Sequence, residues 1–487
     1  MVFPIVGGTQ STGYDISNSL KFNDNDSSLL SRAFSTNPSD QKLTTISFWF
    51  KIGNITSSFR ALYRFNDGSN TGSVYLRNGN DLQFGWDVSS GTLDVRPSGV
   101  LRDPSAWYHC HIKVDTTQST ASNRVIIHIN GVERTYSYAT YPDQNATLEH
   151  LSNGETYYIG GDGQSSDKYF DGYITEFNVI DGQAKDYTDF GEFDDNGVWI
   201  PKQYTGTYGN NGFFLQFKQT GTSQNSSGIG ADTSGNDLHW ALANFDATDS
   251  VEDTCTNNFA TLNTADMHTT SPTIADGNLD FTGISGTPFT PARSTIAVSQ
   301  GKWYMEYKFK TAGGGVGVMT TQSPIDDHLR DDSDVRSIYR GHGGYYYGRN
   351  NSGGIDDVGG NSVTLSADDI VGIALDLDNG YVYFSKNGTY MNGQDGSTQG
   401  NPAGNNGSSG GAANHPSQLL TDQHDGVWAF MAYDISTATT GNVICNFGNP
   451  PYTPSSVETD ANGFGSFEYA PPSGFFALCT KNLAEFG

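Results

Sequence analysis

The sequence has few cysteines and no long apolar run, and each shortage excludes a class of protein. The four cysteines, Cys110, Cys255, Cys445 and Cys479, are too far apart for a metal knuckle or a CxxC redox pair. We therefore expect free thiols and no disulfide framework. No apolar run approaches the roughly 20 residues of a membrane span. The opening MVFPIVGGTQ lacks the basic and apolar regions of a signal peptide. These features predict synthesis in the cytoplasm and no membrane insertion.

Basic residues and glutamate are also scarce. Lys and Arg number 26 against 53 Asp and Glu, so the formal net charge is -27. This balance argues against nucleic acid, whose binding needs clustered Lys and Arg. Only ten of the acidic residues are glutamate, and aspartate, which favours turns, supplies the rest. With 59 glycines and 13% aromatic residues, the composition predicts an all-β chain with many turns.

Alternating apolar residues predict strands in both halves. Residues 44–52, TTISFWFKI, place an apolar set on one face and Ser47, Trp49 and Lys51 on the other, as in a half-buried strand. Residues 124–133 predict a strand that enters an Asn-Gly hairpin turn at 130–131. In the second half, 372–388 alternates strands with Asn-Gly turns, and 392–414 predicts a long surface loop. A short turn of helix is expected near 183–190.

Six segments of the first half occur in a characteristic order. They are SLKFNDNDSSLLSR at 19–32, ISFWFK at 46–51, WYHCHIKVD at 107–115, IIHINGVE at 126–133, YYIGG at 157–161 and FDGYITEFNVIDGQA at 170–184. Over roughly 200 residues their order and spacing resemble the laminin-G-like, concanavalin A-like lectin fold, a β-sandwich.

The second half carries a different set. It comprises GKWYMEYKF at 301–309, GVGV at 315–318, IVGIALDLDNGYVYFSKNG at 370–388, VWAFMAYD at 427–434 and NFGNPPY at 446–452. This set resembles a SPRY domain. The pairing of the two folds, with VEDTCTNNFATLN at 251–263 and PPSGFFALCTKNL at 471–483, is similar to virion proteins of marine tailed phages.

We therefore predict two antiparallel β-sandwich (jelly-roll) domains in tandem. The predicted parts are an N-terminal docking arm at 1–17, a lectin-like sandwich at 18–218, a linker at 219–252, a SPRY-like sandwich at 253–470 and a C-terminal tail at 471–487. The Gly/Ser-rich stretch 219–236 motivates the linker, and the alternative is an irregular edge of the first sandwich.

No motif predicts catalysis, so the protein is not expected to be an enzyme. A laminarinase-type site needs two Glu that flank an Asp on one strand. Glu192-Phe193-Asp194 begins that spacing, but Gly197 stands in place of the second Glu. We interpret this segment as a polar turn. His109, His111 and His128 are expected to be packed or surface residues and not ligands.

Calcium is the one cofactor that the sequence suggests. The resemblance to laminin-G-like folds implies an ion at the sandwich rim, where Asp24, Asp26 and Asp171 are candidate ligands. The alternative is that these acidic residues cap turns, as Asp and Asn do along the whole chain.

Clustered aromatic residues predict a ligand-binding surface. Residues 339–349, YRGHGGYYYGR, concentrate Tyr339, Arg340, His342, Tyr345, Tyr346, Tyr347 and Arg349 between glycines. Tyrosine stacks on sugar faces and offers a hydroxyl. A strand with one buried face, or a contact between subunits, would explain the same pattern. Trp86, beside Asp87, is a second candidate.

The leading functional hypothesis is a virion surface protein of a tailed phage, at a tail fibre, knob or tip, that binds host cell-surface glycan. The alternatives are a structural protein that decorates the capsid or connects the tail by binding other virion proteins, and a polysaccharide depolymerase. A homo-oligomer is expected, with a trimer as one option.

Overall fold

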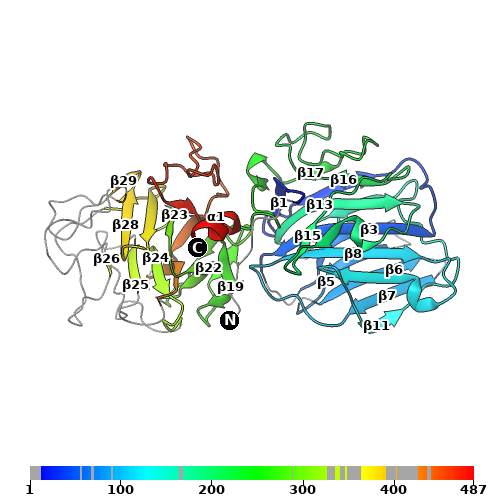
Figure 1. Cartoon of the computed structure of the whole chain (residues 1–487), viewed down its shortest axis with the longest axis horizontal. Coiled ribbons are helices and arrows are strands. Elements are labelled where there is room, and N and C mark those ends of the chain that lie inside the picture. Colours follow the sequence, from blue (N-terminus) through cyan, green and yellow to red (C-terminus); the bar gives the residue numbers. More distant parts are fainter. Residues whose placement is uncertain are drawn as a thin grey trace. The chain divides into compact units, whose positions relative to one another are not determined.

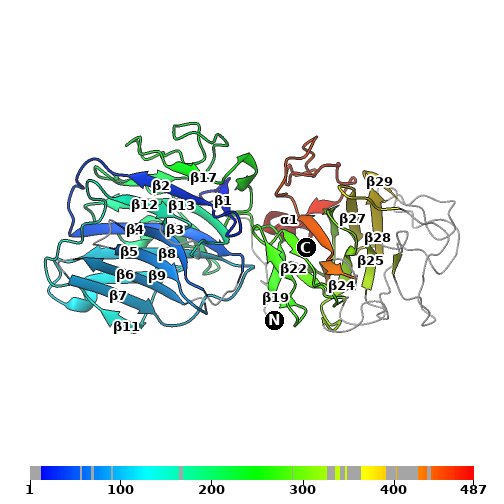
Figure 2. The same ribbon diagram turned by 180° about the vertical axis from the view of Figure 1, so that it is seen from behind.

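The computed structural model forms two compact bodies, residues 11–257 and 258–487. It describes residues 13–54, 58–66, 71–79, 81–88, 91–163, 168–287, 289–325, 335–339, 346–347, 364–390, 402, 426–435 and 440–487. Figures 1 and 2 show the two bodies from opposite sides. Strands dominate both, which confirms the predicted all-β class.

The first body is a sandwich of two antiparallel sheets. Sheet I has the order β10 (Val132–Glu133), β9 (Val125–Ile129), β8 (Trp107–Asp115), β3 (Leu43–Ile52), β13 (Gly172–Asp181), β1 (Ser19–Phe22) and β18 (Ser250–Val251), and β16 (Phe213–Leu215) also pairs with β13. Sheet II has the order β11 (Tyr136–Thr140), β7 (Gly91–Pro97), β6 (Leu82–Val88), β5 (Thr71–Leu76), β4 (Arg60–Asn66), β12 (Thr156–Ile159), β2 (Leu29–Ala33) and β17 (Ala241–Ala243).

Short elements complete the first body. They are the hairpin of β14 (Gly191–Phe193) and β15 (Trp199–Pro201), and the 3-10 turns η1 (Ala121–Asn123), η2 (Tyr187–Asp189) and η3 (Ala247–Asp249). Turn η2 lies where a helical turn was expected. The apolar faces of the two sheets meet in one core, which includes Ile46, Phe48, Phe84, Val95 and Trp240.

Strand β3 departs from its predicted environment. Its apolar face lies in the core as expected, but Ser47, Trp49 and Lys51 on the opposite face are only 1%, 5% and 1% exposed. The prediction of a half-buried strand was therefore wrong. Segments from residues 183–210 and 249–257 cover this outer face of sheet I, and alternation within a strand cannot reveal a cover supplied from elsewhere in the chain.

Residues 219–252, expected to be a linker or an irregular edge of the first sandwich, are folded onto the first body. Trp240 is fully buried in its core, β17 extends sheet II and β18 pairs with β1. The Gly/Ser-rich part is ordered by Asp232, which accepts hydrogen bonds from the Phe214 and Ser234 amides at 2.9 Å each. The turn chemistry of Asp and Gly thus builds an edge of the sandwich.

The second body also has two sheets. Sheet III has the order β19 (Leu262–Met267), β22 (Ala292–Val298), β30 (Trp428–Asp434), β24 (Gly314–Thr320), β25 (Val335–Tyr339) and β26 (Tyr346–Tyr347). Sheet IV has the order β20 (Thr273–Ala275), β21 (Asp280–Thr282), β31 (Asn442–Asn446), β23 (Lys302–Phe309), β27 (Ile370–Asp376), β28 (Tyr381–Lys386) and β29 (Thr389–Tyr390). Residues from both sheets form its core.

The segment 471–487, expected to be a tail, contributes to the second body. Strand β32 (Phe476–Ala477) pairs in parallel with β23, and helix α1 (Thr480–Phe486) follows it. Leu478 is fully buried in the core. The expected loop at 392–414 lies outside the described residues except for residue 402.

A turn occurs at all three predicted Asn-Gly sites, and two of them are two-residue hairpin turns. The third, at 379–380, belongs to a four-residue turn between β27 and β28 in which Gly380 has a φ of 75°. Asn130 and Gly131 adopt φ of 49° and 73° between β9 and β10, and Asn387 and Gly388 adopt φ of 49° and 77° between β28 and β29. Positive φ at both central residues is what a type I′ hairpin requires.

All four cysteines are free thiols, as expected. Among the residues that the structure describes, no helix has the length and apolar character needed to cross a membrane.

Candidate functional site

The outer face of sheet I is covered by polar and aromatic side chains. Lys51 Nζ pairs with Asp253 Oδ2 at 2.8 Å, both 1% exposed, and Trp107 Nε1 donates to Asp253 Oδ1 at 3.2 Å. Strand β15 lies over β8 in Figure 1 and brings the Trp199 ring against His109. This face is therefore closed to any large ligand.

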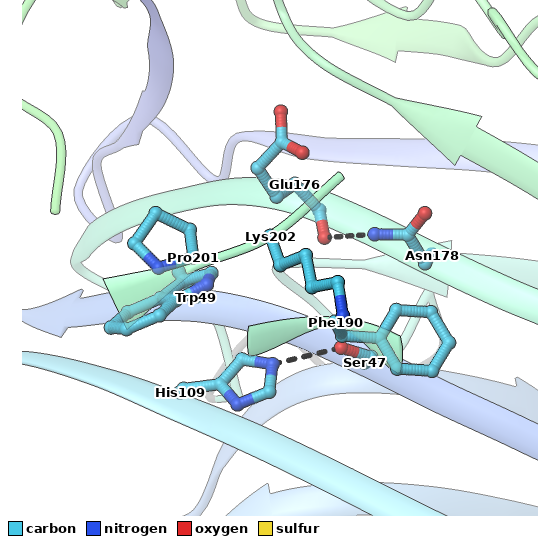
Figure 3. Close-up of a pocket in the computed structure, with 8 residues that line it drawn as sticks. All are labelled: Ser47, Trp49, His109, Glu176, Asn178, Phe190, Pro201 and Lys202. Carbon is cyan, nitrogen blue, oxygen red and sulfur yellow. Dashed lines mark hydrogen bonds between the residues drawn. The ribbon is translucent and has the colours of Figure 1, made fainter. Parts of the chain in front are cut away.

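A small pocket lies beneath the β14–β15 hairpin (Figure 3). Its lining consists of Ser47, Trp49, His109, Glu176, Asn178, Phe190, Pro201 and Lys202. The space measures about 180 Å³, part of it open solvent, and its interior has room for about one water molecule. A sugar ring does not fit there.

Ser47 and His109 resemble a nucleophile and its base, because Ser47 Oγ lies 2.9 Å from His109 Nε2. The other ring nitrogen, Nδ1, accepts a hydrogen bond from Trp199 Nε1 at 3.0 Å. An indole N–H can only donate, so the neutral ring carries its proton on Nε2 and donates it to Ser47. Burial lowers the pKa of His109 to about 3, which keeps the ring neutral. His109 therefore has no lone pair facing Ser47 and does not activate its hydroxyl.

Glu176 is the carboxylate of this pocket. It lies in a bulge of β13, between the paired residues Thr175 and Asn178, with a φ of 50°. Burial raises its pKa to about 7, and the Tyr14 hydroxyl donates to Oε1 at 3.2 Å. In Figure 3 the carboxylate points away from Ser47 and His109. Glycoside hydrolysis takes two facing carboxyl groups, and the lining residues supply this one alone.

Within the part of the chain that the structure describes, no segment covers the outer face of sheet II, seen in Figure 2, in this way. Strand β5 alternates strictly between buried and partly exposed residues, with Ser73 and Tyr75 on the outer side. On β7, Leu93 and Val95 face the core, and Asp94 and Arg96 alternate with them. Ser73, Tyr75, Asp94 and Arg96 are thus partly exposed to a ligand, whereas Arg64 on β4 is only 9% exposed.

Register aligns these outer residues in rows across the strands. One row runs Tyr158, Arg64, Ser73, Gly85 and Asp94, from β12 to β7. The small residues Ser73 and Gly85 form its middle. At a strand spacing of about 4.8 Å, the three steps from Arg64 to Asp94 span about 14 Å. The small residues Ser73 and Gly85 therefore lie between the polar groups of Arg64 and Asp94, over a length that exceeds one sugar ring.

A second row places aromatic and amide side chains beside the first. Tyr75 is in register with Gln83, and Arg96 with Tyr138, whose side chain is 49% exposed. The Arg96 guanidinium lies 4.6 Å from the centroid of the Tyr138 ring. Gln83 Nε2 donates to Asp94 Oδ1 at 2.9 Å, which links the two rows.

Ion pairs hold the cations of this face in place. Arg64 Nη1 donates to Asp162 Oδ2 and to the Tyr75 hydroxyl, both at 2.6 Å. Lys168 Nζ lies 3.3 Å from the same Asp162 oxygen. Arg96 Nη2 lies 2.6 Å from Asp94 Oδ2. The polar groups are therefore fixed in position before any ligand arrives.

The structure brings together two of the three predicted calcium ligands. Asn54 Nδ2 donates to Asp171 Oδ2 at 3.0 Å and to Asp24 Oδ2 at 3.3 Å. Asp26 is engaged elsewhere, because its Oδ2 accepts from Asn23 Nδ2 at 2.7 Å. The buried guanidinium of Arg60 faces both carboxylates. Among the described residues, no group of three or more His, Cys, Asp or Glu side chains has a metal-binding arrangement.

Calcium takes six to eight oxygen ligands, and this cluster does not fit it while Arg60 is present. Asp24, Asp171 and Asn54 supply few oxygens, and Arg60 already uses both the side-chain and the main-chain oxygen of Asn54. A cation placed among them would lie beside the guanidinium charge.

The predicted aromatic cluster lies largely outside the described residues. Arg340, His342, Tyr345 and Arg349 are outside them entirely. Tyr339 ends β25, and Tyr346 and Tyr347 form β26 at the edge of sheet III. Trp86 belongs to β6, in register with Gly72 and Leu93. The side chains of these four residues are outside the described part.

Sequence reasoning missed the outer face of sheet II. Its polar residues carry a signal, because Thr71, Ser73 and Tyr75 alternate with apolar residues, and so do Asp94 and Arg96. Those segments were not recognised as strands of one sheet, since their register depends on pairing between strands.

Comparison with known proteins supports the fold. Residues 23–185, a third of the chain, match the model of the concanavalin A-like lectin/glucanases superfamily. This part of the first body is thus similar to that superfamily, as its segments predicted. No curated protein sequence matches the chain.

Three solved structures are similar to the chain. A SAP-like pentraxin from Limulus polyphemus is 16% identical, with 36% of this chain and 80% of that one covered and a TM-score of 0.27. The SPRY domain of human HERC1 is 16% identical, with 34% and 87% covered and a TM-score of 0.23. Domains LG4-5 of the mouse laminin alpha1 chain are 10% identical, with 90% of each chain covered and a TM-score of 0.31.

Proposed function

We propose that this protein binds neutral glycans on the outer face of sheet II and does not cleave them. The observation that carries the proposal is the open pair of rows on that face. It combines tyrosine rings with an amide, a carboxylate and guanidinium groups over the small residues Ser73 and Gly85. The lectin fold of the first body agrees with this use of a sheet face.

The chemistry of a sugar matches this surface. Tyr138 offers an exposed ring on which the C–H face of a pyranose can stack. Asp94 accepts hydrogen bonds from hydroxyls, and Gln83 both donates and accepts. Their mutual hydrogen bond fixes their orientation, so binding orders few side chains.

Charge favours a neutral glycan. The chain has a net charge of -27, which repels acidic polysaccharides at a distance. On the face itself, Arg64 and Lys168 share Asp162, and Arg96 is paired with Asp94. These pairs join three cations to two carboxylates, so the face keeps one net positive charge against the strongly negative charge of the whole chain.

The same ion pairs argue for binding without cleavage. A glycosidase keeps one carboxyl group protonated as its general acid. Asp94 and Asp162 each already use a carboxylate oxygen in an ion pair with a guanidinium, so neither is a free carboxyl group facing a bound sugar. The carboxylate of the small pocket, Glu176, lies on the other sheet.

We further propose that the glycan belongs to a host cell surface and that the protein is exposed on a tailed-phage virion. The support is the similarity of residues 251–263 and 471–483, and of the order of the two folds, to such virion proteins. Immunogold labelling of particles with an antibody to this chain tests the location. Label on the capsid, with no glycan binding, would favour the structural alternative.

A glycan array followed by calorimetry tests binding. Wild-type protein is expected to bind neutral hexose polymers, and Tyr138→Ala and Gln83→Ala are expected to weaken binding about tenfold or more, as loss of an anchoring contact does. Phe193→Ala is the matched control, because Phe193 is also 49% exposed but lies on the β14–β15 hairpin over sheet I. Unchanged affinity in both sheet II variants, or equal loss in the control, would exclude this face. Release of new reducing ends would instead show a depolymerase.

A further inference from the structure

The rim where calcium was expected contains a buried cation of its own. Arg60 begins β4, Asn54 follows β3, and Asp171 directly precedes β13. Asp24 lies in the turn after β1. Arg60 is 2% exposed and Asp171 is fully buried. Four segments that are distant in sequence thus converge on one guanidinium.

The cluster is built around Asp171 and tolerates little movement. The Gly53 amide donates to the Asp171 carbonyl oxygen at 3.0 Å. A Cβ at Gly53 would lie 2.9 Å from Asp171 Cγ, so the glycine makes room for the carboxylate. This carboxylate is therefore held in a fixed place by the backbone.

Asn54 connects the carboxylates to the guanidinium. Its Nδ2 donates to Asp24 and Asp171, while its Oδ1 accepts from Arg60 Nη1 at 2.9 Å. Arg60 Nη1 also donates to the Asn54 carbonyl oxygen. Burial lowers the pKa of Arg60 to about 10, and the charges of Asp171 and Asp24 oppose that change, so the group stays charged at neutral pH.

A divalent ion and this guanidinium exclude each other. One carboxylate oxygen of each aspartate accepts from Asn54, both oxygens of Asn54 accept from Arg60, and a second cation a few ångströms away would be strongly repelled in a buried site. A guanidinium gives fixed, planar hydrogen bonds and remains in place without any free ion.

We propose that Arg60 is a permanent internal cation at this rim, and that Asp24, Asn54 and Asp171 form a latent calcium site that is blocked as long as Arg60 is present. The fold then needs no calcium. Removal of the guanidinium leaves two carboxylates without their counter-charge, and a hard divalent cation becomes the natural replacement.

Thermal unfolding of the full chain, with millimolar CaCl2 or with EDTA, tests the proposal. The wild-type Tm is expected to change by less than about 1 °C between the two conditions, because no new ligand binds the native state. Arg60→Ala is expected to unfold at a lower temperature in EDTA and to gain about 5 °C or more with calcium. Arg60→Lys, which keeps the positive charge, is the control and should show no calcium response.

Two further variants identify the site. In Arg60→Ala/Asp171→Asn the calcium response should disappear, since one of the two carboxylates is gone. If Arg60→Ala does not fold under any condition, the calcium response of the wild type is compared with that of Asp24→Asn. Asp24 is partly exposed, so its substitution should leave the protein folded. The proposal would be overturned if calcium raised the Tm of the wild type and this rise were absent in Asp24→Asn. Folded Arg60→Ala without any calcium response, by Tm or by calorimetry with CaCl2, would overturn it as well.

Discussion

The two sheets of the first body differ in what lies on their outer faces. Sheet I buries both faces, because residues 183–210 and 249–257 cover Trp49 and Lys51. Sheet II buries one face and leaves Tyr75, Arg96 and Tyr138 on the other. Both sheets nevertheless use the same alternation of apolar and polar residues.

This difference separates stability from recognition. On sheet I, Lys51 and Asp253 are buried and form an ion pair between two segments that are distant in the sequence. On sheet II, Arg96 and Asp94 form a pair at the surface, where an ion pair contributes little to stability. Substitutions on the outer face of sheet I should therefore change the free energy of unfolding, and substitutions on the outer face of sheet II should change the affinity for glycan.

The largest effect on stability is expected from removing the buried ion pair of Lys51 and Asp253 on sheet I. Asp253→Ala removes the carboxylate that pairs with the buried Lys51 charge, and we expect the first body to lose about 3–5 kcal/mol of stability. Denaturant unfolding followed by tryptophan fluorescence measures this, since Trp107 also contacts Asp253.

Its control replaces both charges. Lys51→Met/Asp253→Leu should recover much of the loss, because no buried charge then remains unpaired. If Asp253→Ala were as stable as the wild type, the ion pair of Lys51 and Asp253 would not stabilise the packing of residues 249–257 on sheet I.

A smaller, pH-dependent effect is expected at Glu176. Its folded pKa, about 7, lies above the usual 4.5. The protonated form is thus favoured by folding, and this contribution is fully present below pH 4.5 and lost as pH rises through 7. The stability of wild type relative to Glu176→Gln should therefore fall by about 3 kcal/mol between pH 4.5 and pH 8.

Taking the difference between the two proteins removes the opposite effect of the histidines. Burial lowers the pKa of His109, His111 and His128, so their contribution is lost as pH falls below 6.5. It is present in both proteins. Glu306 in the second body, whose burial also raises its pKa to about 7, is likewise unchanged. A difference that stays constant with pH would refute the burial of Glu176.

The smallest effect on stability is expected on the open face. Arg96→Ala removes an ion pair whose side chains are 27% and 17% exposed, and the change in stability should stay within about 1 kcal/mol. Glycan binding should weaken nonetheless, because Arg96 orients Asp94 and lies against Tyr138. A loss of several kcal/mol would mean that this face is structural, like that of sheet I.

Part of the candidate site could be predicted from the sequence. The resemblance pointed to Asp24 and Asp171 at one rim, and the structure places both carboxylates around Asn54. Arg60 was not foreseen, because nothing local links it to Asp171, more than a hundred residues later. The sequence therefore predicted a calcium ion at this rim, whereas the structure places the Arg60 guanidinium beside the two carboxylates.

Sequence by itself determined the strands, their apolar faces and the Asn-Gly turns at 130–131 and 387–388. These features depend on neighbouring residues only, through the two-residue period of a strand and the positive φ that Asn and Gly tolerate. Tertiary structure alone decided which polar faces are open. Ser47 and Ser73 have the same local pattern, but segments far along the chain cover the first and leave the second partly exposed.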